Sequence, residues 1–90
     1  MQTLPSPHLD GNAVAGPLAD ILGFDATTAS ARCAGCGQVG MLAAAMAYVD
    51  AMGAVLRCPG CDAVLATLVE GPGRTWLSLR GIAALEVPTP

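Results

Sequence analysis

The chain is short, apolar and weakly acidic: it has 90 residues, of which 53% are hydrophobic and 12% charged, and its formal net charge is −3. This length is enough for one domain. Because affinity for phosphate groups comes mainly from clustered lysine and arginine, and the chain has four arginines and no lysine, the composition argues against a nucleic-acid surface and against an anionic membrane surface.

The first eight residues, "MQTLPSPH", hold two prolines and little to bury, so we predict a disordered arm over residues 1–8. They show neither the basic start nor the apolar run of a secretory signal. The longest apolar stretch, residues 41–49, is far shorter than the roughly 20 residues that a membrane span needs. We therefore expect a cytoplasmic protein with reduced thiols, built as a single domain over residues 9–87 with a tail at 88–90.

A short helix is predicted over residues 12–22. Asp10 or Asn12 can cap its first turn, and Gly23 is a natural left-handed stop. Three apolar side chains fall on one face of this helix at i, i+3 and i+4: Leu18, Ile21 and Leu22.

The middle of the chain is ambiguous between strand and helix. Residues 26–31 are predicted as a short strand that leads into the first cysteines. Residues 41–49 favour a helix on propensity, yet this segment must bring Cys58 back beside Cys33. A hairpin does this, with one strand near 41–49 and a return strand over 54–57, and we favour it because closure is the harder constraint.

The last third of the chain predicts a second hairpin. Residues 64–69 and 75–80 read as strands around "EGPGR", whose Gly-Pro-Gly core is a strong turn signal. Residues 81–87 are predicted as a final edge strand. Alternation in the 75–80 strand separates Leu77 and Leu79 on one side from Trp76, Ser78 and Arg80 on the other.

The four cysteines occur in two matching phrases, "RCAGCG" at 32–37 and "RCPGCD" at 57–62. Two cysteines separated by two residues can wrap a tight turn with both sulfurs facing one point. Two such turns present four thiolates at tetrahedral corners, which is the closed geometry of structural zinc. The gap of 21 residues between the pairs slightly exceeds the usual 15–20, and a hairpin supplies that length. The candidate metal ligands are Cys33, Cys36, Cys58 and Cys61.

The residues beside the cysteines fit the same hypothesis. Gly35 and Gly60 lie inside the pairs, where backbone N–H groups must approach the sulfurs. Asp62 follows the second pair where glycine follows the first, and aspartate is one of the few residues that tolerate positive φ. Arg32 and Arg57 precede the pairs and can offset the negative charge of a four-thiolate zinc site from the second shell. The alternative for both arginines is an exposed strand end.

Three other interpretations of the cysteines stay open. Disulfides require an oxidising compartment. Iron in a rubredoxin-type site uses the same four ligands, but such sites gather aromatic residues, and these are only 3% of this chain. A redox-active Cys-x-x-Cys normally occurs as a single pair at a helix start.

The paired turns resemble the knuckles of the zinc-ribbon superfamily over residues 32–62. From His8 to Val87, "HLDGNAVAGPLADILG", the two cysteine phrases and "GRTWLSLRG" resemble more closely an uncharacterised family of small zinc-ribbon proteins from high-GC actinobacteria. The resemblance implies a small metal-stabilised β fold (zinc ribbon, rubredoxin-like knuckles) with antiparallel hairpins and a short N-terminal helix. It implies zinc bound by the four cysteines and no established activity. Ala34 for proline and Asp62 for glycine depart from the usual ribbon pattern.

The sequence offers no convincing catalytic apparatus, and His8 reads as a solvated residue of the arm. We expect a binding module rather than an enzyme, with a protein partner or a second copy and no small-molecule substrate. The alternatives are a nucleic-acid-binding zinc ribbon and a rubredoxin-like electron-transfer accessory protein. Arg74, Trp76 and Arg80 form the candidate partner contact. Apolar strand residues exceed what one small sheet face can hide: Met46, Val49, Val64, Leu65, Leu68 and Leu77.

Overall fold

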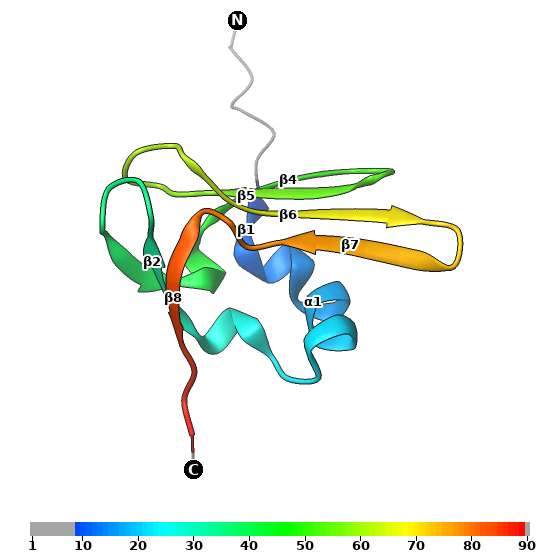
Figure 1. Ribbon diagram of the computed structural model, residues 1–90, viewed down its shortest axis with the longest axis horizontal. Coiled ribbons are helices and arrows are strands. Elements are labelled where there is room, and N and C mark those ends of the chain that lie inside the picture. Colours follow the sequence, from blue (N-terminus) through cyan, green and yellow to red (C-terminus); the bar gives the residue numbers. More distant parts are fainter. Residues whose placement is uncertain (1–8, 90) are drawn as a thin grey trace, which may run out of the picture.

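Two antiparallel sheets and one short α-helix make up the part of the chain that the computed structural model describes, residues 9–89 (Figure 1). The larger sheet has the strand order β1-β4-β5-β6-β7 and the smaller sheet has the order β3-β2-β8. The strands are β1 (Leu9–Asp10), β2 (Ser30–Cys33), β3 (Val39–Met41), β4 (Met46–Asp50), β5 (Gly53–Arg57), β6 (Val64–Gly71), β7 (Arg74–Ser78) and β8 (Ile82–Glu86). The helical elements are α1 (Ala15–Leu22) and the 3₁₀-helices η1 (Gly11–Val14), η2 (Ala26–Thr28) and η3 (Leu42–Ala44). The predicted arm, residues 1–8, lies outside the described residues.

The predicted helix is confirmed, with its first turn wound as η1. Asp10 caps this turn, because its carboxylate accepts a hydrogen bond from the Asn12 backbone N–H at 3.1 Å. Gly23 ends α1 in the left-handed conformation, with φ of 82°, and its N–H donates to the Ala19 carbonyl at 2.8 Å.

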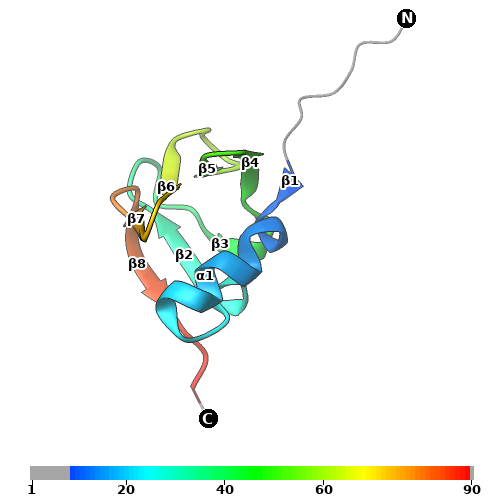
Figure 2. The same cartoon turned by 90° about the vertical axis from the view of Figure 1, so that its right-hand side faces the viewer.

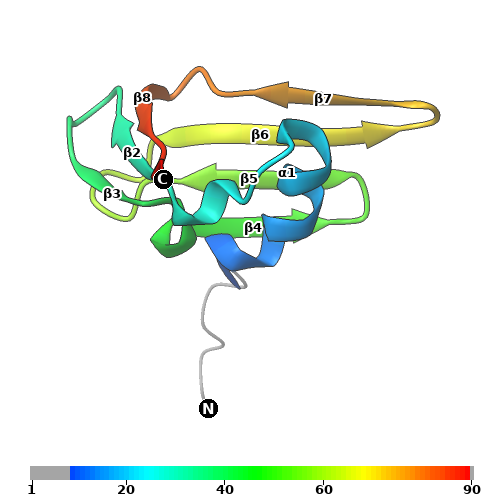
Figure 3. The ribbon, with the colours of Figure 1, turned by 90° about the horizontal axis from the view of Figure 1, so that it is seen from below.

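The helix covers one face of the larger sheet, as Figure 3 shows. Val14 and Leu18 are 3% and 2% exposed and pack with Leu56, Leu68 and Leu77 of β5, β6 and β7. Ile21 was expected on the same buried face, but it is 41% exposed. The helix therefore buries only its Leu18 side deeply, and the core elsewhere consists largely of alanine: Ala26, Ala29, Ala31, Ala45, Ala47, Ala54 and Ala66.

Both predicted hairpins are present. β4 and β5 pair with Tyr48 opposite Val55, and β6 and β7 pair with Val69 opposite Trp76. The Asp50 carboxylate closes the β4–β5 turn by accepting the N–H groups of residues 52 and 53 at 2.8 and 3.1 Å.

Two predicted strands have the wrong bounds. Residues 26–28 form η2 instead of a strand, because the Asp25 carboxylate accepts both the backbone N–H and the hydroxyl of Thr27. The strand expected over 41–49 is interrupted by η3, since Leu42 turns into the core at 3% exposure. η1 packs against this turn, where a Cβ at Gly11 would collide with the Leu42 carbonyl.

The end of the chain pairs with a strand far from it in the sequence. The strand predicted over 75–80 ends at Ser78, and the chain crosses to the smaller sheet at Gly81, which donates its N–H to the Leu65 carbonyl at 3.0 Å. The predicted final strand is present as β8 and is an edge strand, but it pairs with β2. Pro88 and Thr89 of the predicted tail follow it without regular structure.

None of the helices in the described part of the chain is long and apolar enough to cross a membrane.

Candidate metal centre

The four cysteines meet where the two sheets adjoin. Cys33 ends β2 and Cys36 lies in the turn after it, whereas Cys58 directly follows β5 and Cys61 lies in the turn before β6. The smaller sheet thus contributes one pair of thiols and the larger sheet contributes the other pair.

The spacing of the sulfurs matches a tetrahedral metal site. The four Sγ atoms lie within 4.8 Å of one another. Cys33 Sγ is 3.7 Å from Cys61 Sγ, and Cys36 Sγ is 3.8 Å from Cys58 Sγ. A tetrahedron of sulfurs with metal–sulfur bonds of 2.3 Å has edges of about 3.8 Å. The four cysteines can therefore hold one metal ion with little movement.

The two cysteine turns, residues 33–38 and 58–63, have the same backbone hydrogen bonds. In the first turn the Cys33 N–H donates to the Gln38 carbonyl at 2.9 Å, and the Gly37 N–H donates to the Cys33 carbonyl at 2.8 Å. The equivalent bonds of the second turn have the same lengths, 2.9 and 2.8 Å, and join Cys58 to Ala63 and Asp62 to Cys58.

Each turn also places a glycine N–H within hydrogen-bond distance of a sulfur. Gly35 donates to Cys33 Sγ and Gly60 donates to Cys58 Sγ, both at 3.3 Å. These two sulfur acceptors belong to the buried cysteines, whereas Cys36 and Cys61 are exposed. Such donors stabilise a thiolate, which is the form that binds metal.

The thiols influence one another's protonation. The backbone N–H of Cys36 lowers the pKa of Cys33 to about 7, although burial acts in the opposite direction. The backbone N–H of Ala63 acts to lower the pKa of Cys61, but partial desolvation of the sulfur and the neighbouring thiols together raise it to about 12. The raised pKa keeps the Cys61 thiol protonated until a cation compensates the negative charge of the cluster.

The two predicted second-shell arginines differ in their surroundings. Arg57 Nη1 donates to the Asp62 carbonyl at 2.8 Å and lies 3.9 Å from Asp62 Oδ2. Arg57 therefore supports the second cysteine turn without contacting a sulfur. Arg32 is exposed on β2 and forms no side-chain hydrogen bond or ion pair within residues 9–89. This favours the alternative interpretation, in which Arg32 is an exposed residue at the end of a strand.

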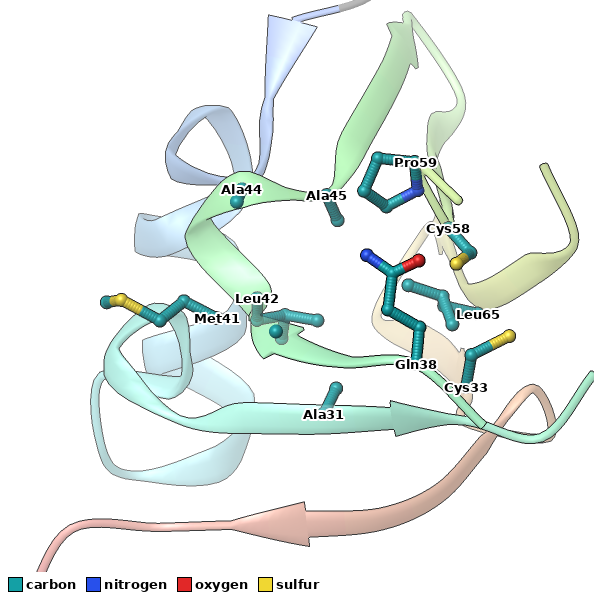
Figure 4. A pocket seen from close by; sticks show the side chains of 11 residues that line it. Ala31, Cys33, Gln38, Met41, Leu42, Ala44, Ala45, Cys58, Pro59 and Leu65 are labelled. Atoms are coloured by element: carbon teal, nitrogen blue, oxygen red, sulfur yellow. The ribbon is translucent and has the colours of Figure 1, made fainter. Parts of the chain in front are cut away.

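Gln38 is a residue of the site that sequence reasoning missed. Its side-chain amide lies over Gly60 of the second turn, where a Cβ would collide with the Gln38 side-chain oxygen. Figure 4 shows the amide pointing toward Cys58 and Pro59, into a hollow of about 80 Å³ beside the cysteines. The hollow is lined by Ala31, Cys33, Gln38, Gly40, Met41, Leu42, Ala44, Ala45, Cys58, Pro59 and Leu65. No single motif signals this contact, because it joins residues 22 positions apart.

Two of the three predicted partner-contact residues lie away from the cysteines, whereas Arg80 precedes Gly81, whose carbonyl accepts the N–H of Ala34 in the first cysteine turn. Arg74 and Trp76 belong to β7, whose hairpin with β6 extends away from the smaller sheet (Figure 1). Trp76 is 55% exposed. Arg80 is also exposed but lies beyond the end of β7, and His8 is outside the described residues.

Comparison with known proteins gives one family. The model of a family of unknown function, DUF6510, matches residues 5–90. No curated protein and no solved structure matches the chain.

Proposed function

We propose a zinc-binding structural module for this chain, which belongs to the DUF6510 family. One zinc ion is held by Cys33, Cys36, Cys58 and Cys61, and it joins the two sheets. The module serves contacts with another protein surface and carries out no reaction of its own.

The observation that supports this proposal best is the pair of sulfur separations. Distances of 3.7 and 3.8 Å agree with the edge of about 3.8 Å for a tetrahedral zinc–thiolate site. Four protein ligands leave no position for water or substrate, which is typical of structural zinc and not of catalytic zinc.

The zinc-ribbon assignment draws support from where the cysteine turns lie. The first turn connects β2 and β3, and the second connects β5 and β6; both pairs are antiparallel. A zinc ribbon likewise places its knuckles at the ends of hairpins. The chain has only one tryptophan, one tyrosine and one phenylalanine, and none of them lines the hollow beside the cysteines. That apolar, aromatic-poor surrounding favours zinc over the rubredoxin-type iron site.

Elemental analysis of protein purified without added metal tests the proposal. We expect about one zinc per chain, and loss of that zinc in Cys58→Ser. Met52→Ser is the matched control, because Met52 is a 65% exposed side chain in the β4–β5 turn. Stoichiometric iron with a visible charge-transfer band would favour the rubredoxin-like electron-transfer alternative over structural zinc. Protein without bound metal would overturn both hypotheses.

A nucleic-acid role is the alternative to protein contact. The net charge of −3 and the four arginines, one of which is bound to the second cysteine turn, disfavour it. We expect no oligonucleotide binding at physiological salt. Submicromolar binding that weakens steeply with added salt would contradict this expectation.

A further inference from the structure

One face of the larger sheet is uncovered in the part of the chain that the structure describes. Figure 2 shows α1 and the smaller sheet on the same side of the larger sheet, so the opposite side is open. We call the opposite side the outer face. Strand alternation and register place the side chains of Val55, Thr67, Val69 and Trp76 on it. Val69 and Trp76 are 38% and 55% exposed.

The outer face contains a hollow centred on a residue without a side chain. The hollow has a volume of about 120 Å³ and is lined by Tyr48, Asp50, Met52, Gly53, Val55 and Thr67, among others. Gly53 lies on β5, and a Cβ at this position would collide with the Leu68 carbonyl of β6. The close approach of the two strands thus requires glycine at this position, and residue 53 has no side chain that could fill the hollow.

The same face also carries an exposed aromatic side chain. Register aligns Gly53, Val69 and Trp76 across β5, β6 and β7 in one row. The edge of the Trp76 indole lies against Gly71, where a Cβ would be 3.0 Å from the ring. More than half of the side chain nevertheless remains accessible, and Trp76 is the only tryptophan of the chain.

We propose that the outer face binds a second copy of this chain, with Trp76 of each copy packed into the Gly53 hollow of the other. This extends the proposed role in protein contact by naming the partner, and it rests on that role but not on the identity of the metal.

Register shows why the face is complementary to itself. A two-fold axis along β6, between two sheets packed face to face, places β7 of one copy over β5 of the other. This axis keeps the rows of the two copies at the same height along the strands. Trp76 of one copy therefore lies opposite Gly53 of the other, and the two Val69 side chains face each other. Packed sheets are about 10 Å apart, and the side chains of both must share that gap. An indole fits best where the opposing residue has no side chain.

Charge favours the same arrangement. Arg74 pairs with Gly71. It lies two residues from Trp76 on β7, nearer the tip of the β6–β7 hairpin, so its side chain is on the same face as Trp76. The two-fold axis brings Arg74 toward the β4–β5 turn of the other copy, where the Asp50 carboxylate is exposed. Opposite charges at this position favour the register in which Trp76 meets the hollow.

The size of the face limits how stable the contact can be. Four strands with about five residues each span roughly 300 Å² of sheet plane, from a strand spacing of about 4.8 Å and a rise of about 3.3 Å per residue. The two faces together span less than the roughly 1,000 Å² of a stable interface, so the contact is expected to be weak and transient. We therefore expect a dimer with a dissociation constant in the micromolar range.

Sedimentation and tryptophan fluorescence of the metal-loaded protein test the proposal between about 1 and 500 µM, a range that brackets a micromolar dissociation constant. We expect the mass to rise from monomer to dimer while the emission of Trp76 shifts to shorter wavelength. Val69→Arg places two like charges on the axis and is expected to weaken association at least tenfold, as is Trp76→Ser. Val87→Arg is the matched control, because Val87 is 38% exposed, as Val69 is, and lies beyond the end of β8, so its substitution should leave the dimer unchanged.

The metal content of every sample is measured as well, so that loss of the dimer can be distinguished from loss of the metal. A variant that retains zinc but not the dimer supports the interface. If Val69→Arg loses its metal, Trp76→Ser decides the question instead, since its side chain is mostly exposed. A monomer over the whole range with constant emission overturns the proposal, and so does a dimer that resists Val69→Arg and Trp76→Ser.

Discussion

The two cysteine turns have the same backbone and different residues. Their two backbone hydrogen bonds have equal lengths, and both turns contain a residue in the left-handed region: Gly37 with φ of 78° and Asp62 with φ of 66°. The first turn uses the residue for which this conformation carries no steric penalty. The second uses aspartate and adds Arg57, which holds the Asp62 carbonyl at 2.8 Å. The turn geometry required by the sulfurs is therefore reached either by glycine or by a supported side chain.

The surroundings of the two turns explain what a metal would contribute. The first turn belongs to the smaller sheet and is tied to the start of β8 through the Ala34 N–H, which donates to the Gly81 carbonyl at 2.8 Å. The second turn connects two central strands of the larger sheet. Each is preceded by a register shift, between Arg32 and Cys33 in one sheet and at Leu56 and Arg57 in the other. A bound ion joins two sheets that are otherwise connected by an alanine-rich core.

The largest expected effect comes from removing a ligand from either turn. Cys36→Ser and Cys58→Ser should both abolish stoichiometric metal binding and the cooperative thermal transition, because metal binding and folding are coupled in such small domains. Cys58→Ser should also leave less residual secondary structure than Cys36→Ser, since Cys58 is 2% exposed and Cys36 is exposed. Circular dichroism and metal analysis measure both effects. A Cys58→Ser protein with unchanged spectrum and melting would show that the site is not needed for folding.

The next largest effect tests the left-handed residues themselves. Gly37→Ala should lower the free energy of unfolding by about 1–2 kcal/mol, because an L residue is strained at this φ. Asp62→Gly should change it by less than about 0.5 kcal/mol, since glycine relieves strain while the weak contact with Arg57 is lost.

Gly16→Ala is the control for the glycine substitution. A Cβ at Gly16 meets no atom within 4 Å, and the residue lies in α1, so alanine should stabilise the protein by about 0.5–1 kcal/mol. Urea unfolding of the metal-loaded proteins measures all three changes. Equal destabilisation by Gly37→Ala and Gly16→Ala would indicate that the turn conformation is not the cause.

Local signals in the sequence predicted much of this fold. The Gly-Pro-Gly turn located β6 and β7, and Asp10 and Gly23 bounded the helix. The requirement that Cys58 return to Cys33 correctly favoured a hairpin over the helix that alanine propensity suggested. That constraint is covalent and geometric, so it outweighs propensities of a few tenths of a kcal/mol per residue.

Those local signals could not predict which distant segments of the chain lie together. β8 pairs with β2, about 50 residues earlier in the chain, because Gly81 allows a close approach to the Val64 carbonyl and Leu65 at the point where the chain changes sheets. A glycine in a loop carries no sign of this contact. The same applies to the Gln38 amide over Gly60: the four cysteines were visible as a pattern, but the side chain that bridges their turns was not.

This bridge provides the third comparison between the turns. Gly35 and Gly60 occupy equivalent positions, but a Cβ at Gly35 would meet Ala63 Cβ at 3.4 Å, whereas one at Gly60 would collide with the Gln38 side-chain oxygen. Gly60→Ala should therefore destabilise the protein by about 1 kcal/mol, as Gln38 is displaced, and Gly35→Ala should be nearly neutral. In the Gln38→Ala background the cost of Gly60→Ala should largely disappear, which a double-mutant cycle measures directly. Additive effects would exclude the contact as the cause.

The smallest effect concerns the two arginines. Arg57→Met should lower the free energy of unfolding by about 0.5 kcal/mol, because the bond from Nη1 to the Asp62 carbonyl is lost at a site that is 37% exposed. Arg32→Met should change it less, since Arg32 makes no such bond in the described residues. Both variants lose one positive charge and keep a long apolar side chain, so the difference between them isolates the hydrogen bond from the charge. The rate at which a chelator removes the bound metal is the second measurement, and it should rise for Arg57→Met only. An equal rise for both variants would mean that positive charge near the sulfurs matters and the bond does not, which would support the predicted role of Arg32 in offsetting the negative charge of the metal site.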